Sequence, residues 1–89
     1  MATGREVVLL DPDPETRMLV RTLLERDGFR VQEAQDPQQA VDVLRACRAT
    51  AIVIAPVLSE QNPGLADDIA ALQPNLDVLT PANYGEALL

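Results

Sequence analysis

With 89 residues, the chain is expected to form one small domain, in which folding buries only about 60–65% of the surface of the unfolded chain. Its net charge of −7 at pH 7 argues against binding to nucleic acid or to anionic membrane surfaces. All seven basic residues are arginine. The absence of histidine and lysine removes the commonest general base, the commonest metal ligand and Schiff-base chemistry.

Cysteine content and hydropathy indicate the cellular compartment. The single cysteine, Cys47, excludes an intramolecular disulfide, and its place at the end of an apolar helical pattern predicts a small core residue. No signal-peptide core follows Met1, and no apolar run reaches membrane-spanning length. We therefore expect a cytoplasmic protein.

The first predicted elements are a strand and a helix. The run EVVLLD, residues 6–11, is continuously apolar until its last residue, which is typical of a strand that is buried on both faces. The helix that follows is predicted to begin at Pro14, with Asp13 as its N-cap, and to end before Gly28. Four apolar residues at helical spacing predict its buried face: Leu19, Val20, Leu23 and Leu24.

The next elements repeat this order. Residues 30–34 predict a short strand at an edge of the sheet, because its alternation of apolar and polar residues is only partial. Asp36 and Pro37 give the start signal of a second helix. The run TAIVIA, residues 50–55, predicts a buried strand that ends in Ala55, at a place where open α/β sheets usually carry their chemistry.

The last predicted elements are a third helix and a fourth strand. Asn62 is predicted to cap this helix, Pro63 to occupy its first position and Pro74 to stop it. Its expected apolar face consists of Leu65, Ile69 and Leu72. Residues 76–80 predict the fourth strand. Alternation of strands and helices with short connections indicates an α/β fold with a parallel sheet and right-handed crossovers.

Three segments carry a likeness to a known family. VVLLDPDPETRMLVRTLLERDGFRVQEAQDPQQAVDVL (7–44), ATAIVIAPVLSE (49–60) and LDVLTPAN (76–83) together resemble bacterial response-regulator receiver domains. This resemblance implies a flavodoxin-like parallel sheet of strand order 2-1-3-4, truncated before the fifth βα unit. The chain, residues 1–89, is then a single truncated domain.

The resemblance also implies a site, and the chain departs from it. In receivers an aspartate at the tip of the third strand accepts a phosphoryl group, and two acids after the first strand hold Mg²⁺. Here the acceptor position falls on Ala55, and the acid pair falls on Asp11 and Pro12. Asp13 is acidic but lies one residue too far along the chain, where it is expected to cap the helix. Thr80 matches the hydroxyl residue that follows the fourth strand.

These departures predict a degenerate receiver, or pseudo-receiver, with no catalytic residue, no metal and no cofactor. The lysine that receivers carry after their fifth strand has no counterpart either. The expected function is phosphorylation-independent protein–protein interaction in bacterial signalling. An alternative is a receiver that accepts phosphate on Asp11 or Asp13. A nucleotide or other small-molecule substrate is not expected, because the turn DPDPET lacks glycine and carries acids that repel phosphate.

The end of the sequence predicts a partner. Without a fifth unit, the fourth strand becomes an edge, and the apolar face near the third and fourth strands is expected to be bare. We expect a homodimer through this edge, with these partner-binding residues: Asp77, Leu79, Tyr84, Leu88 and Leu89. Three alternatives stay open. Leu88 and Leu89 pack on their own sheet, another protein supplies the missing element, or the chain is the N-terminal fragment of a longer response regulator.

Overall fold

The computed structural model describes residues 5–73 and 75–79, and its centre is a four-stranded sheet. The strands are β1 (Glu6–Leu10), β2 (Arg30–Ala34), β3 (Ala51–Ile54) and β4 (Asp77–Leu79). All three strand pairs are parallel, and the strand order is β2-β1-β3-β4. The α/β class and the order 2-1-3-4 that the sequence predicts are therefore confirmed.

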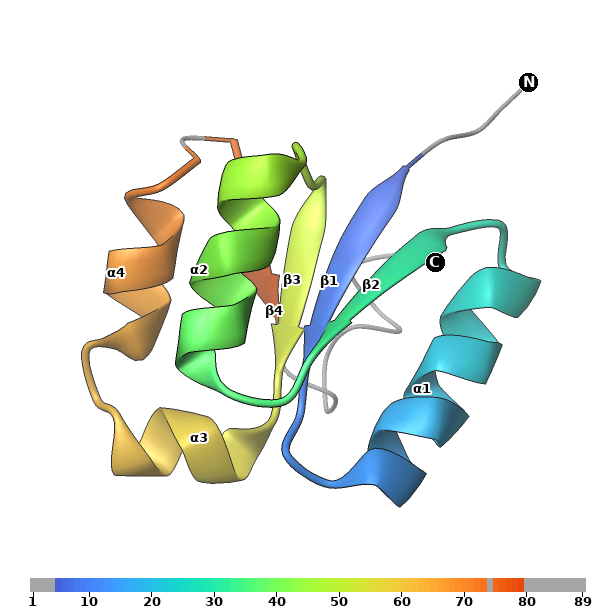
Figure 1. Cartoon of the computed structure of the whole chain (residues 1–89), viewed down its shortest axis with the longest axis horizontal. Coiled ribbons are helices and arrows are strands. Elements are labelled where there is room, and N and C mark those ends of the chain that lie inside the picture. The colour runs from blue at the N-terminus through green and yellow to red at the C-terminus, as the bar shows by residue number, and fades with distance from the viewer. Residues whose placement is uncertain (1–4, 74, 80–89) are drawn as a thin grey trace.

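Helices cover the two faces of the sheet unequally (Figure 1). In the described part of the chain, α1 (Pro14–Arg26) packs on one face. The other face carries α2 (Pro37–Ala46), α3 (Pro56–Gln61) and α4 (Leu65–Ala70). The central strands read as continuous apolar runs because both of their faces are covered. No helix in the described ranges is long and apolar enough to cross a membrane.

Alternation along the strands divides the core into two clusters. Val7 and Leu9 of β1 face α1, whereas Val8 and Leu10 face the three-helix layer, and all four are at most 1% exposed. β3 divides in the same way. The residues that follow the strands at their carboxyl ends are thus held on a rigid frame.

The caps of α1 are those the sequence predicts, but its buried face is narrower. Asp13 is the N-cap, and Gly28, with φ of +95°, occupies the left-handed position after the helix. Val20 and Leu24 are buried, whereas Leu19 is 62% exposed and Leu23 is 37% exposed. The prediction of one face for all four was wrong. They span about 140° of the helix, and the sheet meets only the Val20–Leu24 side.

The predicted third helix corresponds to α4, and a further short helix, α3, precedes it in a segment expected to be a loop. α3 begins directly after β3, with Ala55 at its N-cap position and Pro56 as its first residue. Asn62 lies at the C-terminal end of α3, where its side chain donates to the carbonyl of Leu58 over 3.0 Å, so its predicted role as an N-cap was wrong. α4 begins after Gly64. The sequence reading missed Pro56 as a helix start, although proline suits the first turn.

Candidate functional site

The receiver-like pocket lies where β1 and β3 end side by side. Leu10 and Ile54 are register partners in the parallel pair, so Asp11 and Ala55 follow them at the same edge of the sheet. The backbone N–H of Ala55 donates to the carbonyl of Leu10 over 2.9 Å. The structure therefore brings together two of the residues that the sequence placed in this pocket.

Asp11 is the one buried charged residue among those the structure describes, with 4% exposure. Its Oδ1 accepts from the backbone N–H of Asp13 over 2.9 Å. Its own N–H donates to the carbonyl of Ala34, and its carbonyl accepts from Nη1 of Arg17 over 2.7 Å. Asp11 thus shapes the turn between β1 and α1 by hydrogen bonds to its backbone and side chain.

The other two residues of the predicted acid cluster are exposed. Pro12 contributes no carboxylate. Asp13 accepts from the N–H of Glu15 and from the hydroxyl of Thr16, over 3.3 and 2.5 Å. The Thr16 hydroxyl holds the pKa of the Asp13 carboxyl below its ordinary value. Asp13 is therefore engaged as the cap of α1, as the sequence predicts. Within residues 5–73 and 75–79 no group of three or more metal-ligating side chains occurs.

At the tip of β3, the side chain of Ala55 is a methyl group that is 5% exposed. It offers no nucleophile and no ligand, and α3 has no side-chain cap at this position. Thr80, the predicted hydroxyl residue, lies outside the described residues. Among the described residues of this site, Asp11 is the one buried carboxylate, and the Ala55 methyl group beside it cannot accept a phosphoryl group.

The edge at β4 differs from the expectation in one respect. Ala51 and Val53 are 0% exposed and Leu79 is 9% exposed, so the bare apolar patch expected on these strands is not found. Leu79 belongs to the cluster that faces α1. Asp77 is exposed, as a wet strand edge requires. Three other residues of the predicted partner surface, Tyr84, Leu88 and Leu89, lie outside the described residues.

Backbone direction points the hydrogen-bonding groups of Val78 to the outer side of β4. The N–H of Asp77 donates inward to the carbonyl of Thr50 over 3.2 Å. Successive residues of a strand point their backbone groups to opposite sides, so the N–H of Val78 points away from β3. In the described part of the chain β4 is an edge strand.

An ion-pair network that the sequence analysis missed joins α1 to β2. Nε of Arg17 contacts Oε1 of Glu33 at 2.8 Å, and Arg21 pairs with the same carboxylate and with Glu25. Burial raises the pKa of Glu33, but the two arginines outweigh it and lower that pKa overall. The spacing of Arg17, Arg21 and Glu25 was the available signal, whereas Glu33 required the tertiary structure.

Cys47 is half-buried rather than fully in the core. Burial and the neighbouring Glu6 carboxylate raise the pKa of its thiol. Because the thiolate is the nucleophilic form, this environment disfavours cysteine chemistry.

Comparison with known proteins identifies the class of this fold. No family model matches the sequence, and no curated protein matches it. Solved structures do match. A two-component response regulator from Clostridium difficile superposes with a TM-score of 0.77 at 15% identity, over 86% of this chain and 64% of that one. A response regulator from Thermotoga maritima gives 0.76 at 24% identity, over 97% and 74%.

A third match is a response regulator from Burkholderia pseudomallei that carries a phosphorylated aspartic acid, a calcium ion and citrate. It gives a TM-score of 0.73 at 22% identity, over 96% of this chain and 54% of that one. The chain therefore spans 64% of the Clostridium difficile chain and 54% of the Burkholderia pseudomallei chain. These matches show that the chain has the flavodoxin-like fold of response-regulator receiver domains. At such identities the similarity concerns the fold, and the site must be judged on its own residues.

Proposed function

We propose that this protein is a pseudo-receiver: a non-catalytic, phosphorylation-independent protein-interaction module of bacterial signalling in the cytoplasm. It associates with a second copy of itself through the outer edge of β4. The proposal combines the receiver fold with a pocket that lacks the acceptor, and with a strand edge that offers backbone groups to a partner.

The single observation that carries the proposal is Ala55. The Burkholderia pseudomallei protein has a phosphorylated aspartic acid, and the family resemblance puts the acceptor at the tip of the third strand. Here that tip is a buried methyl group beside one carboxylate. Because Asp13 is engaged as the cap of α1, no second acid is available beside Asp11 to help hold the metal ion that offsets the charge of a transferring phosphoryl group. The domain thus keeps the frame of a receiver without its chemistry.

Phosphate acceptance by a different acid is disfavoured by the contacts of both candidates. Oδ1 of Asp11 is hydrogen-bonded inside a tight turn, and the residue is 4% exposed. Both oxygens of Asp13 accept hydrogen bonds that cap α1. Phosphorylation of either would break these contacts, and for Asp13 it would cost the helix its cap.

Self-association is supported by the edge at β4. An unpaired strand edge is a template on which another chain adds a strand. Asp77 is exposed there, and the N–H of Val78 points outward with no partner among the described residues, as a symmetric contact requires. A charged side chain at such an edge restricts pairing to partners that accommodate it, which favours one arrangement over unspecific aggregation.

Phosphotransfer is tested by intact-mass spectrometry after incubation with acetyl phosphate and Mg²⁺. We expect no phosphate adduct and no change in the ¹⁵N–¹H spectrum on adding Mg²⁺. A receiver that retains its acceptor aspartate serves as the positive control. A stoichiometric adduct that disappears in Asp11→Asn or Asp13→Asn would overturn the proposal and assign the acceptor.

A further inference from the structure

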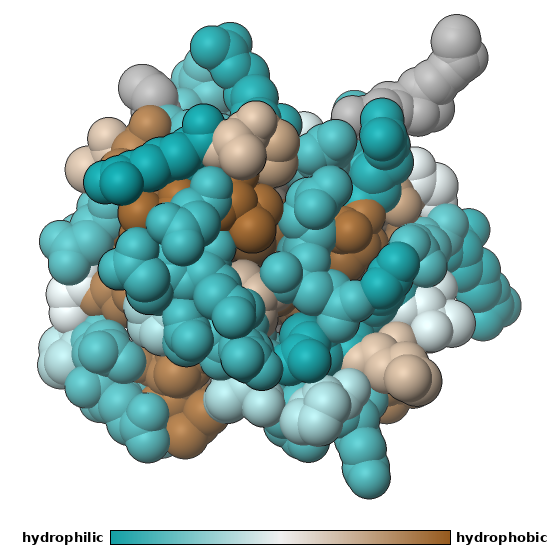
Figure 2. Space-filling view, viewed as in Figure 1, coloured by the Kyte–Doolittle hydropathy of each residue, from teal (hydrophilic) through white to brown (hydrophobic). Residues whose placement is uncertain are grey.

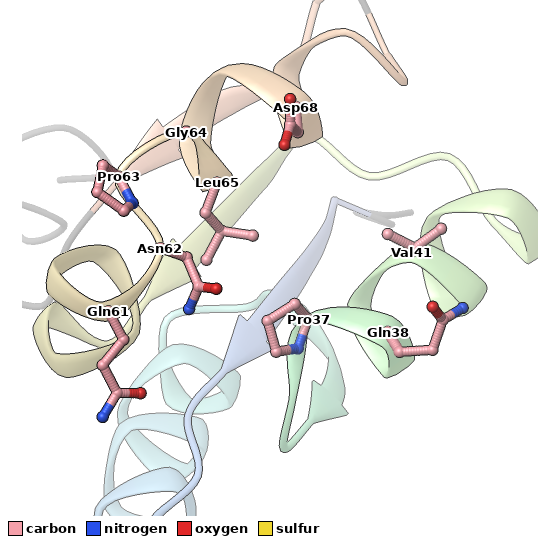
Figure 3. A pocket seen from close by; sticks show the side chains of 9 residues that line it. All are labelled: Pro37, Gln38, Val41, Gln61, Asn62, Pro63, Gly64, Leu65 and Asp68. Atoms are coloured by element: carbon pink, nitrogen blue, oxygen red, sulfur yellow. The ribbon is translucent and has the colours of Figure 1, made fainter.

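A groove lies in the three-helix layer, toward the end of the molecule where the strands have their carboxyl ends. It is bounded by the first turns of α2, the end of α3 and the start of α4 (Figure 3). Its volume is about 480 Å³, and it is open along one side. Pro37, Val41 and Leu65 provide apolar walls. An open groove leaves much of a small ligand in water, so its shape suits a peptide segment that lies across it.

Side-chain amides and one carboxylate supply the polar atoms of this groove. Nε2 of Gln38 donates to Oδ1 of Asp42 over 3.2 Å, and Nδ2 of Asn62 donates to the carbonyl of Leu58 over 3.0 Å. Both amide oxygens are thereby left without a donor among the described residues. Figure 3 shows the oxygen of Asn62 turned toward α2, and the Asp68 carboxylate at the rim above Gly64. The amides can both donate and accept, whereas the Asp68 carboxylate only accepts, so it favours a guest with hydrogen-bond donors.

Charge favours the same guest. No basic residue lines the groove, and Glu60 and Asp67 lie on the helices that bound it. The four ion pairs of the described residues all belong to α1, β1 and β2, so the acids of α3 and α4 are not neutralised by arginine. Asp36 caps α2 and offsets the positive end of that helix.

The surface around the groove mixes apolar and polar side chains. Figure 2 is drawn from the side of the three-helix layer and shows apolar surface between hydrophilic side chains there. A segment that carries both apolar and cationic groups complements such a surface, because the stem of an arginine side chain packs on apolar walls while its guanidinium stays polar.

We propose that this groove docks a short arginine-bearing segment of a partner protein. The guanidinium donates to the Asp68 carboxylate and to the amide oxygens of Gln38 and Asn62, and its aliphatic stem packs against Val41 and Leu65. Arginine fits better than lysine because its planar fork supplies five donors. The inference rests on the proposed function in one respect: both take the partner to be a protein. It does not require self-association.

The test is a titration of ¹⁵N-labelled protein with an amidated hexapeptide that alternates leucine and arginine. Saturable shifts are expected at Gln38, Val41, Gly64 and Asp68, with a dissociation constant below about 1 mM. Asp68→Asn is expected to weaken binding about tenfold, because it removes a charge-assisted hydrogen bond. Asp67→Asn is the matched control, since it changes the net charge equally on the neighbouring residue, and it is expected to weaken binding less than about twofold.

Three outcomes would overturn the docking proposal. They are equal weakening by the two variants, shifts spread over the surface rather than at the groove, and equal binding of a peptide with glutamate in place of arginine. The solution mass of the free protein reports the proposed function separately. A monomer that binds the peptide at Asp68 would refute self-association and leave the groove assignment standing, whereas a dimer that ignores the peptide would do the reverse.

Discussion

The two faces of the sheet are built by different means. On one face α2, α3 and α4 contribute Ala40, Leu44, Leu58, Leu65 and Ile69 to the core, and the described residues of these helices form no ion pair. On the other face α1 contributes Val20 and Leu24 and is tied to β2 through Glu33. The first layer is held mainly by apolar burial, and the second by a narrow apolar stripe with charged flanks.

Because only a narrow stripe of α1 is buried, this helix exposes apolar side chains to solvent. Met18 and Leu19 of α1 are 69% and 62% exposed, although both are large and apolar. Single exposed apolar residues are ordinary on protein surfaces. On α1 they show that the apolar pattern of a helix does not by itself say how much of the helix is buried.

The largest expected effect comes from the two leucines of α1 with opposite exposure. Leu24→Ala removes a side chain that is 0% exposed, and it should lower the free energy of unfolding by about 2–5 kcal/mol. Leu19→Ala, the matched control, is expected to change it by less than about 0.5 kcal/mol. Urea unfolding followed by circular dichroism measures both. Equal losses would mean that Leu19 is covered in solution, and would break the comparison between the faces.

A smaller effect on stability is expected at Asp11, in the turn between β1 and α1. Asp11→Ala removes the acceptor for the N–H of Asp13 and should cost about 1–3 kcal/mol of unfolding free energy. Asp11→Asn keeps an acceptor oxygen and should cost less than about 1 kcal/mol. Thermal unfolding of the two variants measures the difference. If both are as stable as the parent protein, Asp11 is retained for a reason other than the turn.

The ion pairs that join α1 to β2 should make the free energy of unfolding depend on pH. Because the arginines lower the pKa of Glu33 in the folded state, this carboxylate stabilises the fold above its unfolded pKa of about 4.3, and the stabilisation is lost as the pH falls through the folded pKa. Glu33→Gln should therefore cost about 1 kcal/mol at pH 7 and progressively less below about pH 4.

Urea unfolding of the parent protein and of Glu33→Gln at pH 7 and at about pH 3 measures this pH dependence. Asp42→Asn, on the three-helix face, is the control and should show little effect at either pH. A loss for Glu33→Gln that stays constant down to the lower pH would mean that the ion pairs do not anchor α1.

Local signals allowed much of this fold to be predicted. Asp13 with Pro14 and Asp36 with Pro37 marked helix starts because capping and proline geometry act within a few residues. Apolar runs marked the buried strands, and their alternation with helices fixed a parallel sheet. The position of Ala55 directly after a buried strand could likewise be predicted.

What the sequence did not reveal depends on tertiary contacts. The exposure of Leu19 depends on which part of α1 meets the sheet. The pairing of Glu33 with Arg17 joins elements that are 16 residues apart. The groove depends on how α2, α3 and α4 come together, which local signals do not reveal.

Solution mass at several concentrations, by light scattering coupled to size exclusion, tests the central claim most directly. The parent protein should elute with the mass of two chains. Val78→Pro removes the outward N–H of β4 and should shift the dimer–monomer midpoint at least about tenfold, whereas Val78→Thr keeps that N–H and should leave it unchanged. A folded parent protein that is monomeric at every concentration, or a Val78→Pro variant that dimerises equally well, would contradict self-association through β4.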